Sequence, residues 1–241
     1  MNPVLQINDL CRDQILHHIS FEMETGEMLA IMGPSGSGKS TLLYNAAGLD
    51  RPDGGQIRLN NTELSALSED DRAKLRLTQI GFVFQQMNTV PGLSLEENIA
   101  LPGIQAQSRR SKKQVYQKAR ILMKQLGLEG MEDRQVSQVS GGQLQRACIC
   151  RSLINEPHIL FADEPTGALN RQASKEVMDE LVKLNRRGMS ILMVTHDSKT
   201  AACCDRILYL QDGQIQDELR LGRQDAQREA RVNDWLASHG W

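Results

Sequence analysis

The sequence lacks several features that mark particular classes of protein. It has no uninterrupted run of about 18 apolar residues, so no segment is expected to span a bilayer. It has no excess of one charge, because 28 Lys and Arg stand against 30 Asp and Glu, for a net charge of −2. No global field is therefore expected to draw the chain to nucleic acid or to an anionic membrane. The start, MNPVLQINDL, has neither the charged region nor the apolar core of a signal peptide.

Cysteine is present without the spacing that disulfide or zinc frameworks use. The five cysteines form no CxxC pair and no combination with histidine that suits zinc. We interpret them as free thiols in a reducing cytoplasm. They are Cys11, Cys148, Cys150, Cys203 and Cys204.

Short apolar runs indicate a parallel sheet. A continuous apolar run of strand length is expected of a strand buried on both faces. Such runs alternate with helical stretches, for example 172–187, where apolar residues recur on one face. Alternation of this kind predicts an α/β fold with a doubly wound, mostly parallel sheet. The predicted strands are 28–33, 80–85, 158–163 and 190–196, and 207–215 reads as a hairpin turning at Asp212-Gly213.

The remaining segments predict two further parts. Residues 19–24 and 56–60 alternate between apolar and polar, which is typical of half-buried strands in an antiparallel layer. Residues from about 88 to 150 are helical in pattern and contain no buried strand, so we expect a helical subdomain. The predicted organisation is one domain over 1–216 and a polar, helical tail over 217–241.

The first buried strand leads into a phosphate-binding motif. GPSGSGKST matches GxxxxGK[ST], in which backbone N–H groups and a helix N-terminus surround phosphate oxygens. Lys39 would reach the β- and γ-phosphates, and the Ser40 hydroxyl would ligate Mg²⁺. The motif predicts that the chain binds a nucleoside triphosphate. Its residues are Gly33, Pro34, Ser35, Gly36, Ser37, Gly38, Lys39, Ser40 and Thr41.

The other buried strands deliver polar residues to the same edge of the sheet, where ligands bind in open parallel sheets. Asp163 is expected to hold Mg²⁺ through water, and Glu164 to accept a proton from the attacking water. His196 is expected to hydrogen-bond the γ-phosphate and keep that water aligned with Glu164. Gln85 is an amide able to contact Mg²⁺ or the water and to release it when its loop moves.

The stretch VSGGQ places two glycines in the first turn of a predicted helix. Ser140 and Gln143 fit a capping box, whereas each glycine costs about 1 kcal/mol relative to alanine in a helix. A helix start without side chains presents free N–H groups to an anion. We therefore predict that Ser140, Gly141, Gly142 and Gln143 contact the nucleotide of a second copy of the chain.

Together these motifs resemble those of the ATP-binding-cassette (ABC) ATPases over residues 4–216. GPSGSGKST is similar to Walker A, ILFADE to Walker B, VSGGQ to the LSGGQ signature, and GALN, with Ala168, Leu169 and Asn170, to the D-loop. The resemblance implies ATP and Mg²⁺ as ligands and a head-to-tail dimer that holds two ATP molecules. It also implies a membrane permease as partner, hence a place at the cytoplasmic face of the cell membrane. Within the family the chain looks most like the MacB/LolD/FtsE-like subgroup, which works beside MacB- or FtsX-type permeases in export or extraction of lipoproteins, peptides and drugs.

The sequence departs from the family pattern at two positions. The aromatic residue that usually stacks on adenine corresponds to Gln14, so base stacking is lost and ATP affinity is expected to be low. The D-loop usually ends in aspartate, whereas Asn170 carries no charge. This change bears on coupling between the two sites of the implied dimer.

Other interpretations remain open from sequence. The run Arg109–Lys124 carries seven basic residues and no acid, which suits a solvated helix face or a nucleic-acid-associated ABC ATPase. We expect no nucleic acid, since coiled-coil insertions and second cassettes are absent. The ATP cycle is also compatible with a signalling or cell-envelope regulatory complex that moves no cargo. In the tail, Val232, Trp235 and Leu236 share a helical face that either folds back on the domain or docks a partner.

Overall fold

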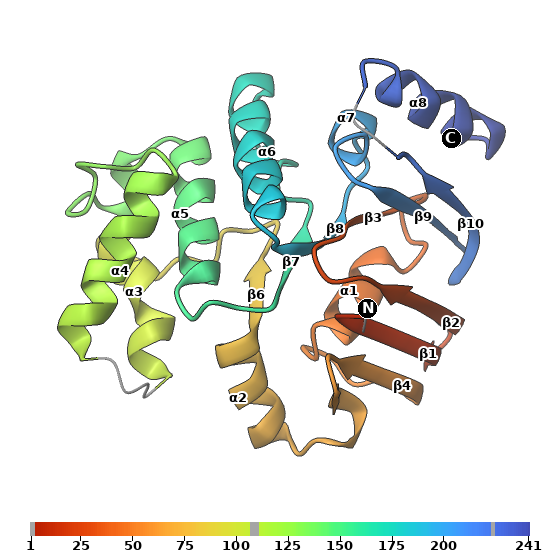
Figure 1. The fold of residues 1–241 in the computed structure, drawn as a ribbon, viewed down its shortest axis with the longest axis horizontal. Coiled ribbons are helices and arrows are strands. Elements are labelled where there is room, and N and C mark those ends of the chain that lie inside the picture. The colour runs from red at the N-terminus through yellow and green to blue at the C-terminus, as the bar shows by residue number, and fades with distance from the viewer. Residues whose placement is uncertain (1–2, 107–110, 223–224) are drawn as a thin grey trace.

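The computed structural model describes residues 3–106, 111–222 and 225–241. Its centre is a six-stranded sheet in the order β10-β9-β3-β8-β7-β6 (Figure 1). All neighbouring strands run parallel except β9 and β10, which form the antiparallel hairpin predicted at Asp212-Gly213. The strands are β3 (Met28–Met32), β6 (Ile80–Val83), β7 (Ile159–Asp163), β8 (Ser190–Val194), β9 (Arg206–Gln211) and β10 (Gln214–Arg220).

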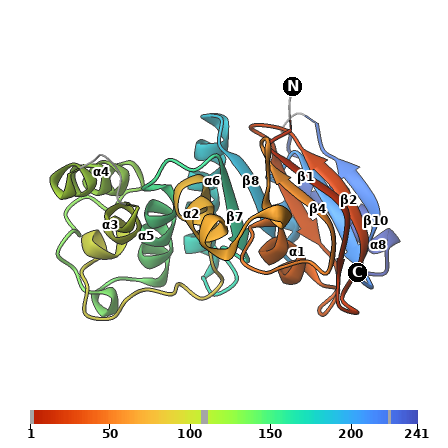
Figure 2. The same ribbon diagram turned by 90° about the horizontal axis from the view of Figure 1, so that it is seen from below.

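A second, antiparallel sheet covers one end of the molecule in the order β2-β1-β4-β5. Figure 2 shows this layer at the opposite end from helices α3 (Leu95–Gln105), α4 (Lys112–Gln125) and α5 (Gly141–Leu153), with β7 and β8 of the parallel sheet between them. The fold class predicted from sequence is confirmed. The strands of this layer are β1 (Leu5–Arg12), β2 (Leu16–Met23), β4 (Gly54–Leu59) and β5 (Thr62–Glu63).

Helices pack on both faces of the parallel sheet. Three of them, α3, α4 and α5, form a separate helical part. The α-helices are α1 (Lys39–Ala46), α2 (Glu69–Gln79), α3 (Leu95–Gln105), α4 (Lys112–Gln125), α5 (Gly141–Leu153), α6 (Arg171–Arg186), α7 (Ser198–Ala201) and α8 (Arg228–Ser238). Short 3-10 helices lie at η1 (Leu64–Ala66) and η2 (Val136–Gln138). No helix in the described part of the chain is long and apolar enough to cross a membrane.

Strand β3 shows why its apolar run is continuous. All five of its residues are buried. Met28, Ala30 and Met32 pack into the apolar cluster on the side of α5, α6 and α8, while Leu29 and Ile31 pack into the cluster that contains α1. Because side chains alternate between the faces of a sheet, only a strand covered on both sides needs apolar residues at every position. The strand that leads into the phosphate loop is therefore fixed from both faces.

The C-terminal tail folds back on the domain. Val232 and Leu236 on α8 are buried against the central cluster, and the indole N–H of Trp235 donates to Asp217 Oδ2 at 2.8 Å. The tail is not helical throughout, because β10 continues to Arg220 before α8 begins at Arg228. Of the two interpretations of its apolar face, the structure shows packing on the same chain.

Candidate nucleotide-binding and hydrolysis site

The phosphate loop lies between β3 and α1 and is fixed by close backbone contacts. Gly33 has φ 149°, and a Cβ added there would lie 1.8 Å from the carbonyl oxygen of Leu210, so no other residue fits. The Lys39 ammonium donates to the carbonyl oxygens of Gly33 and Pro34 at 2.8 and 2.6 Å. Burial lowers the pKa of Lys39, and the carboxylates of Glu164 and Asp163 oppose that shift. A cationic donor is thus held at the N-terminus of α1.

Two features of the loop suit a bound phosphate. The hydroxyl of Ser37 is buried and has no hydrogen-bond partner among the described residues, and buried polar groups rarely stay unpaired. A Cβ added at Gly36, which has φ 81°, would meet no atom within 4 Å. The loop therefore has open space at Gly36 and an unpaired hydroxyl on Ser37 that can donate a hydrogen bond. This local geometry agrees with a triphosphate ligand.

Asp163 ends β7 with a buried carboxylate that is 3% exposed. Its Oδ1 accepts from Ser40 Oγ at 3.1 Å, and its Oδ2 accepts from the Tyr44 hydroxyl at 2.8 Å. Ser40 and Asp163 thus place two oxygen ligands side by side, and Mg²⁺ prefers oxygen ligands. The donor set therefore fits the metal expected from sequence. Burial and the bond to Asp163 raise the pKa of Tyr44 to about 12, so its phenol is a neutral donor at neutral pH.

Glu164 and His196 form a pair beyond the ends of β7 and β8. His196 Nδ1 lies 2.5 Å from Glu164 Oε2, and the Glu164 side chain is 17% exposed while that of His196 is 61% exposed. Glu164 adopts φ 47°, an uncommon conformation for a residue other than glycine. Its N–H donates to the carbonyl oxygen of Val194 at 3.0 Å, which ties the turn to β8. The pair lines a cavity of about 360 Å³ together with Gly167 and Leu169.

Gln85 lies two residues beyond β6, in an exposed position. Val83 pairs with Ala162, so the end of β6 lies beside the strand that delivers Asp163. The loop that follows is fastened to α5: Arg151 donates to the carbonyl oxygens of Met87 and Asn88 at 2.9 and 2.7 Å.

The Sγ of Cys148 also donates to the carbonyl oxygen of Met87, at 3.2 Å. The segment after Gln85 is therefore attached directly to α5, the helix that Ser140 caps. Sequence reasoning singled out neither Arg151 nor the role of Cys148.

Helix α5 begins as predicted. Ser140 Oγ accepts from the N–H of Gln143 at 3.3 Å, and Gln143 Oε1 accepts from the N–H of Ser140 at 2.8 Å, which completes the capping box. Gly142 has a reason that the sequence did not reveal, because a Cβ there would lie 2.9 Å from the Cβ of Ala173 on α6. Close approach of two helices within one chain therefore requires Gly142. Gly141 is exposed, and a Cβ there would lie 3.3 Å from Leu169 Cδ2, a tight contact that would require the leucine side chain to shift slightly.

The D-loop residues Ala168, Leu169 and Asn170 lie between Glu164 and α6. Asn170 Oδ1 accepts from the N–H of Ala173 at 2.9 Å and so caps α6. Asparagine is among the best residues for this position, and an N-cap signal was present in the sequence. A cap needs no charge, so the change from aspartate preserves this structural role.

The signature residues lie apart from the phosphate loop of the same chain. Figure 1 shows α5 among the helices at one side of β7 and α1 at the other. In the described parts of the chain, no hydrogen bond joins residues 140–143 to residues 33–41. Walker A, Asp163, Glu164 and His196 are thus brought together within one chain, whereas the signature residues are not.

The turn between β1 and β2 contains Gln14, which is exposed. Its neighbour Ile15 is 42% exposed, and its Cγ2 would lie 3.1 Å from a Cβ added at Gly38. The side chain next to the phosphate loop at this edge is therefore aliphatic. No described aromatic ring belongs to this turn.

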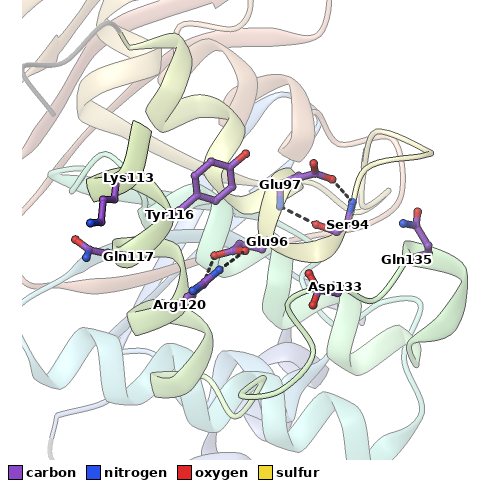
Figure 3. A pocket seen from close by; sticks show the side chains of 9 residues that line it. All are labelled: Ser94, Glu96, Glu97, Lys113, Tyr116, Gln117, Arg120, Asp133 and Gln135. Carbon is purple, nitrogen blue, oxygen red and sulfur yellow. Dashed lines mark hydrogen bonds and ion pairs between the residues drawn. The ribbon is translucent and has the colours of Figure 1, made fainter. Parts of the chain in front are cut away.

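A separate cavity of about 640 Å³ lies among α3, α4 and the segment before η2 (Figure 3). Two of its charged lining residues pair with each other: Arg120 donates to the Glu96 carboxylate through Nε at 2.6 Å and Nη2 at 3.3 Å. Lys124 pairs with Glu129 at 2.8 Å. Arg109 and Arg110 lie outside the described residues. The described part of the basic run therefore includes cations already matched by acids.

A family model described as "ABC transporter" matches residues 16–167. This chain belongs to the ABC transporter family. It is an ABC-type ATPase that binds ATP. Among curated relatives, the macrolide export ATP-binding/permease protein MacB of Bdellovibrio bacteriovorus is 44% identical over 207 residues, which are 86% of this chain and 31% of that protein. The ABC transporter ATP-binding protein YxdL of Bacillus subtilis is 41% identical over 92% of this chain and 88% of its own length.

Solved structures show the same fold. A dimeric, post-hydrolysis structure of the ATP-binding cassette MJ0796 bound to ADP and Pi has a TM-score of 0.83 and 35% identity, and it covers 91% of this chain and 100% of that chain. CbiO1 of Clostridium perfringens, part of the ABC transporter complex CbiONQ, has a TM-score of 0.84 and 25% identity over 99% of this chain and 92% of its own. The chain spans only 31% of the length of the MacB protein that it matches.

Proposed function

We propose that this chain is the ATP-hydrolysing subunit of a membrane transport complex. The observation that carries the proposal is the meeting of Ser40 with Asp163 and of Glu164 with His196 at one edge of the sheet. An ion site beside a carboxylate that is itself oriented by an imidazole suits phosphoryl transfer to water. The names of MacB and YxdL support a transport role.

The proposed mechanism assigns a task to each group. Backbone N–H groups of residues 35–41, with the side chains of Lys39 and Ser37, bind the phosphates. Ser40, Asp163 and Gln85 would hold Mg²⁺, Asp163 through water, and the ion would offset charge on the phosphate oxygens. Glu164 accepts the proton of the attacking water, while His196 orients Glu164 and faces the γ-phosphate. Asp163 is buried and Lys39 is half-buried, and burial strengthens the electrostatic contacts that these two side chains make.

We also propose that hydrolysis requires two chains in a head-to-tail dimer. In that arrangement Ser140, Gly141, Gly142 and Gln143 of one chain complete the site on its partner. The separation of α5 from the phosphate loop within one chain supports this proposal, as does the dimeric state of MJ0796. The D-loop, beside both Gly141 and Glu164, then lies between the two sites.

The proposed partner is a MacB- or FtsX-type permease, and the proposed location is the cytoplasmic face of the cell membrane. We propose an amphiphilic cargo such as a lipoprotein, peptide or drug. We also propose that the chain is divided into an ATPase domain over 1–216 and a C-terminal tail over 217–241. The identity to MacB over the ATP-binding part supports the permease class.

An affinity purification tests this proposal. The Glu164→Gln protein is purified with ATP from detergent-solubilised membranes of its native cell, and copurifying proteins are identified by mass spectrometry. We expect a multi-span permease in stoichiometric amount. Recovery of RNA or DNA without a membrane protein would contradict the proposal. A permease without measurable cargo flux after reconstitution would instead favour the signalling function.

A further inference from the structure

The carboxylate of Asp163 has a donor on each oxygen, and both donors come from α1. Ser40 Oγ bonds Oδ1 at 3.1 Å and the Tyr44 hydroxyl bonds Oδ2 at 2.8 Å. Residues four apart lie on the same face of a helix, so one face of α1 holds the whole carboxylate. The two contacts have different chemistry, because Ser40 belongs to the phosphate loop whereas Tyr44 lies one turn beyond it.

The Tyr44 ring is itself held in place. Its centroid lies 5.7 Å from that of Phe82 on β6, at an interplanar angle of 54°. Phe82 in turn lies 4.2 Å from Phe84 and 6.3 Å from Phe161. A packed ring fixes where its hydroxyl points, so the bond to Oδ2 is a directed one. Bonds from a hydroxyl to a carboxylate are also stronger than those between neutral groups.

We propose that Tyr44 is a positioning residue for the divalent cation. Its hydroxyl holds Oδ2 of Asp163 so that Oδ1 faces Ser40, where the cation would be held by Ser40 and, through water, by Asp163. Without that hydroxyl the buried carboxylate loses one of its two donors and the restraint on its rotation. This inference rests on the proposed role of Asp163 in the metal site. Partners that orient a ligand in this way typically contribute about 10- to 100-fold in metal affinity.

The test uses the full chain in a Glu164→Gln background, in which hydrolysis does not interfere. Mn²⁺ is titrated into the ATP complex and free Mn²⁺ is followed by electron paramagnetic resonance. We expect Tyr44→Phe to weaken Mn²⁺ binding roughly tenfold. ATP affinity measured in EDTA should stay within about twofold, because the variant keeps the ring and touches no phosphate-binding group.

Two further variants separate the hydroxyl from the ring. Tyr209→Phe removes a hydroxyl from a buried tyrosine on the face of the sheet that packs against α8, and it should leave Mn²⁺ affinity unchanged. Tyr44→Leu removes ring and hydroxyl together and should weaken Mn²⁺ binding at least as much as Tyr44→Phe does. In hydrolysis assays without the Glu164→Gln change, saturating Mg²⁺ should restore most of the kcat of Tyr44→Phe.

The possible outcomes distinguish this inference from the proposed function. Equal Mn²⁺ affinity of Tyr44→Phe and its parent would overturn the positioning role. If Mn²⁺ affinity fell only in Tyr44→Leu, the ring and not the hydroxyl would be responsible, which would also overturn it. A loss of ATP affinity in EDTA would also overturn it, since the role would then be structural. If the parent itself bound no Mn²⁺ with ATP, the proposed metal site would fail first.

Discussion

At the scale of single residues, the site depends on a few polar atoms held by neighbours. Glu164 occupies a left-handed conformation and contacts His196 at 2.5 Å, so its carboxylate is oriented by both its backbone and its partner. Strained backbone conformations often occur at functional sites, where surrounding contacts hold them. Under the proposed function, hydrolysis would depend on this one carboxylate.

Replacement of that carboxylate gives the first prediction. Glu164→Gln removes the proposed proton acceptor but no proposed phosphate contact, so turnover should fall about 10²- to 10⁴-fold while an ATP-bound dimer accumulates. Phosphate release and light scattering measure the two effects. Glu129→Gln, a change on an exposed residue that pairs with Lys124, is the matched control. A Glu164→Gln protein that hydrolyses ATP at the native rate would exclude Glu164 as the base.

The turn at Gln14 gives the second prediction. Gln14→Tyr supplies a ring where the chain has an exposed amide beside the aliphatic Ile15. Stacking of a base on an aromatic ring contributes about 1–3 kcal/mol, which corresponds to roughly 5- to 150-fold in affinity. ATP should bind more tightly by a factor in that range in a fluorescence titration. An unchanged dissociation constant would remove Gln14 from the base-binding region.

At the scale of elements, α5 connects the signature residues to the loop after Gln85. Its first turn carries the signature residues, and Arg151 near its end holds the carbonyl oxygens of Met87 and Asn88. Because these hydrogen bonds join the loop after Gln85 to α5, movement of the loop would be transmitted to the helix. The helix also packs so closely on α6 that Gly142 admits no side chain.

Removing that attachment gives the third prediction. Arg151→Met deletes two hydrogen bonds from a charged donor, which are worth about 1.5–3 kcal/mol each. Local opening of residues 84–90 should become easier, so their amide hydrogens should exchange at least tenfold faster. Arg120→Met, which breaks the pair with Glu96 in the same helical part, should leave exchange in 84–90 unchanged. Equal exchange in Arg151→Met and the parent would show that other contacts hold the loop.

The elements also show how far sequence reasoning reaches. Buried strands were predictable because β3 and its neighbours need apolar residues on both faces, and the capping box at Ser140 is local in the chain. Tyr44 was not predictable, because its partner Asp163 lies 119 positions away and nothing in α1 marks the contact. The close approach of Gly142 to Ala173 likewise depends on how two helices pack. Asn170 was a missed local signal, since a residue of this type before a helical pattern predicts a cap.

At the scale of the whole molecule, the two proposed halves of a nucleotide site lie on different parts of the chain. The phosphate loop and Asp163 adjoin the central sheet, while Ser140 begins a helix of the helical part. Under the proposed head-to-tail arrangement, each chain supplies one half to each of two sites.

The fourth prediction tests this arrangement. Ser140→Arg places a bulky cation at the proposed interface without touching the phosphate loop, so ATP binding should persist while ATP-dependent dimerisation is lost. Ser111→Arg is the matched control, because Ser111 caps α4 with the same capping box. Light scattering of both variants in the Glu164→Gln background measures the dimer. A normal dimer of Ser140→Arg would contradict the arrangement.

The separation of the two half-sites within one chain has a genetic consequence. If each nucleotide site is formed by two chains, a chain with one defective half-site can still dimerise with a normal chain. Every such mixed dimer then contains at least one defective nucleotide site. An allele that encodes Glu164→Gln would then be dominant over the normal allele in proportion to its dosage. An allele that encodes Ser140→Arg would be recessive, because its product would not enter the pair.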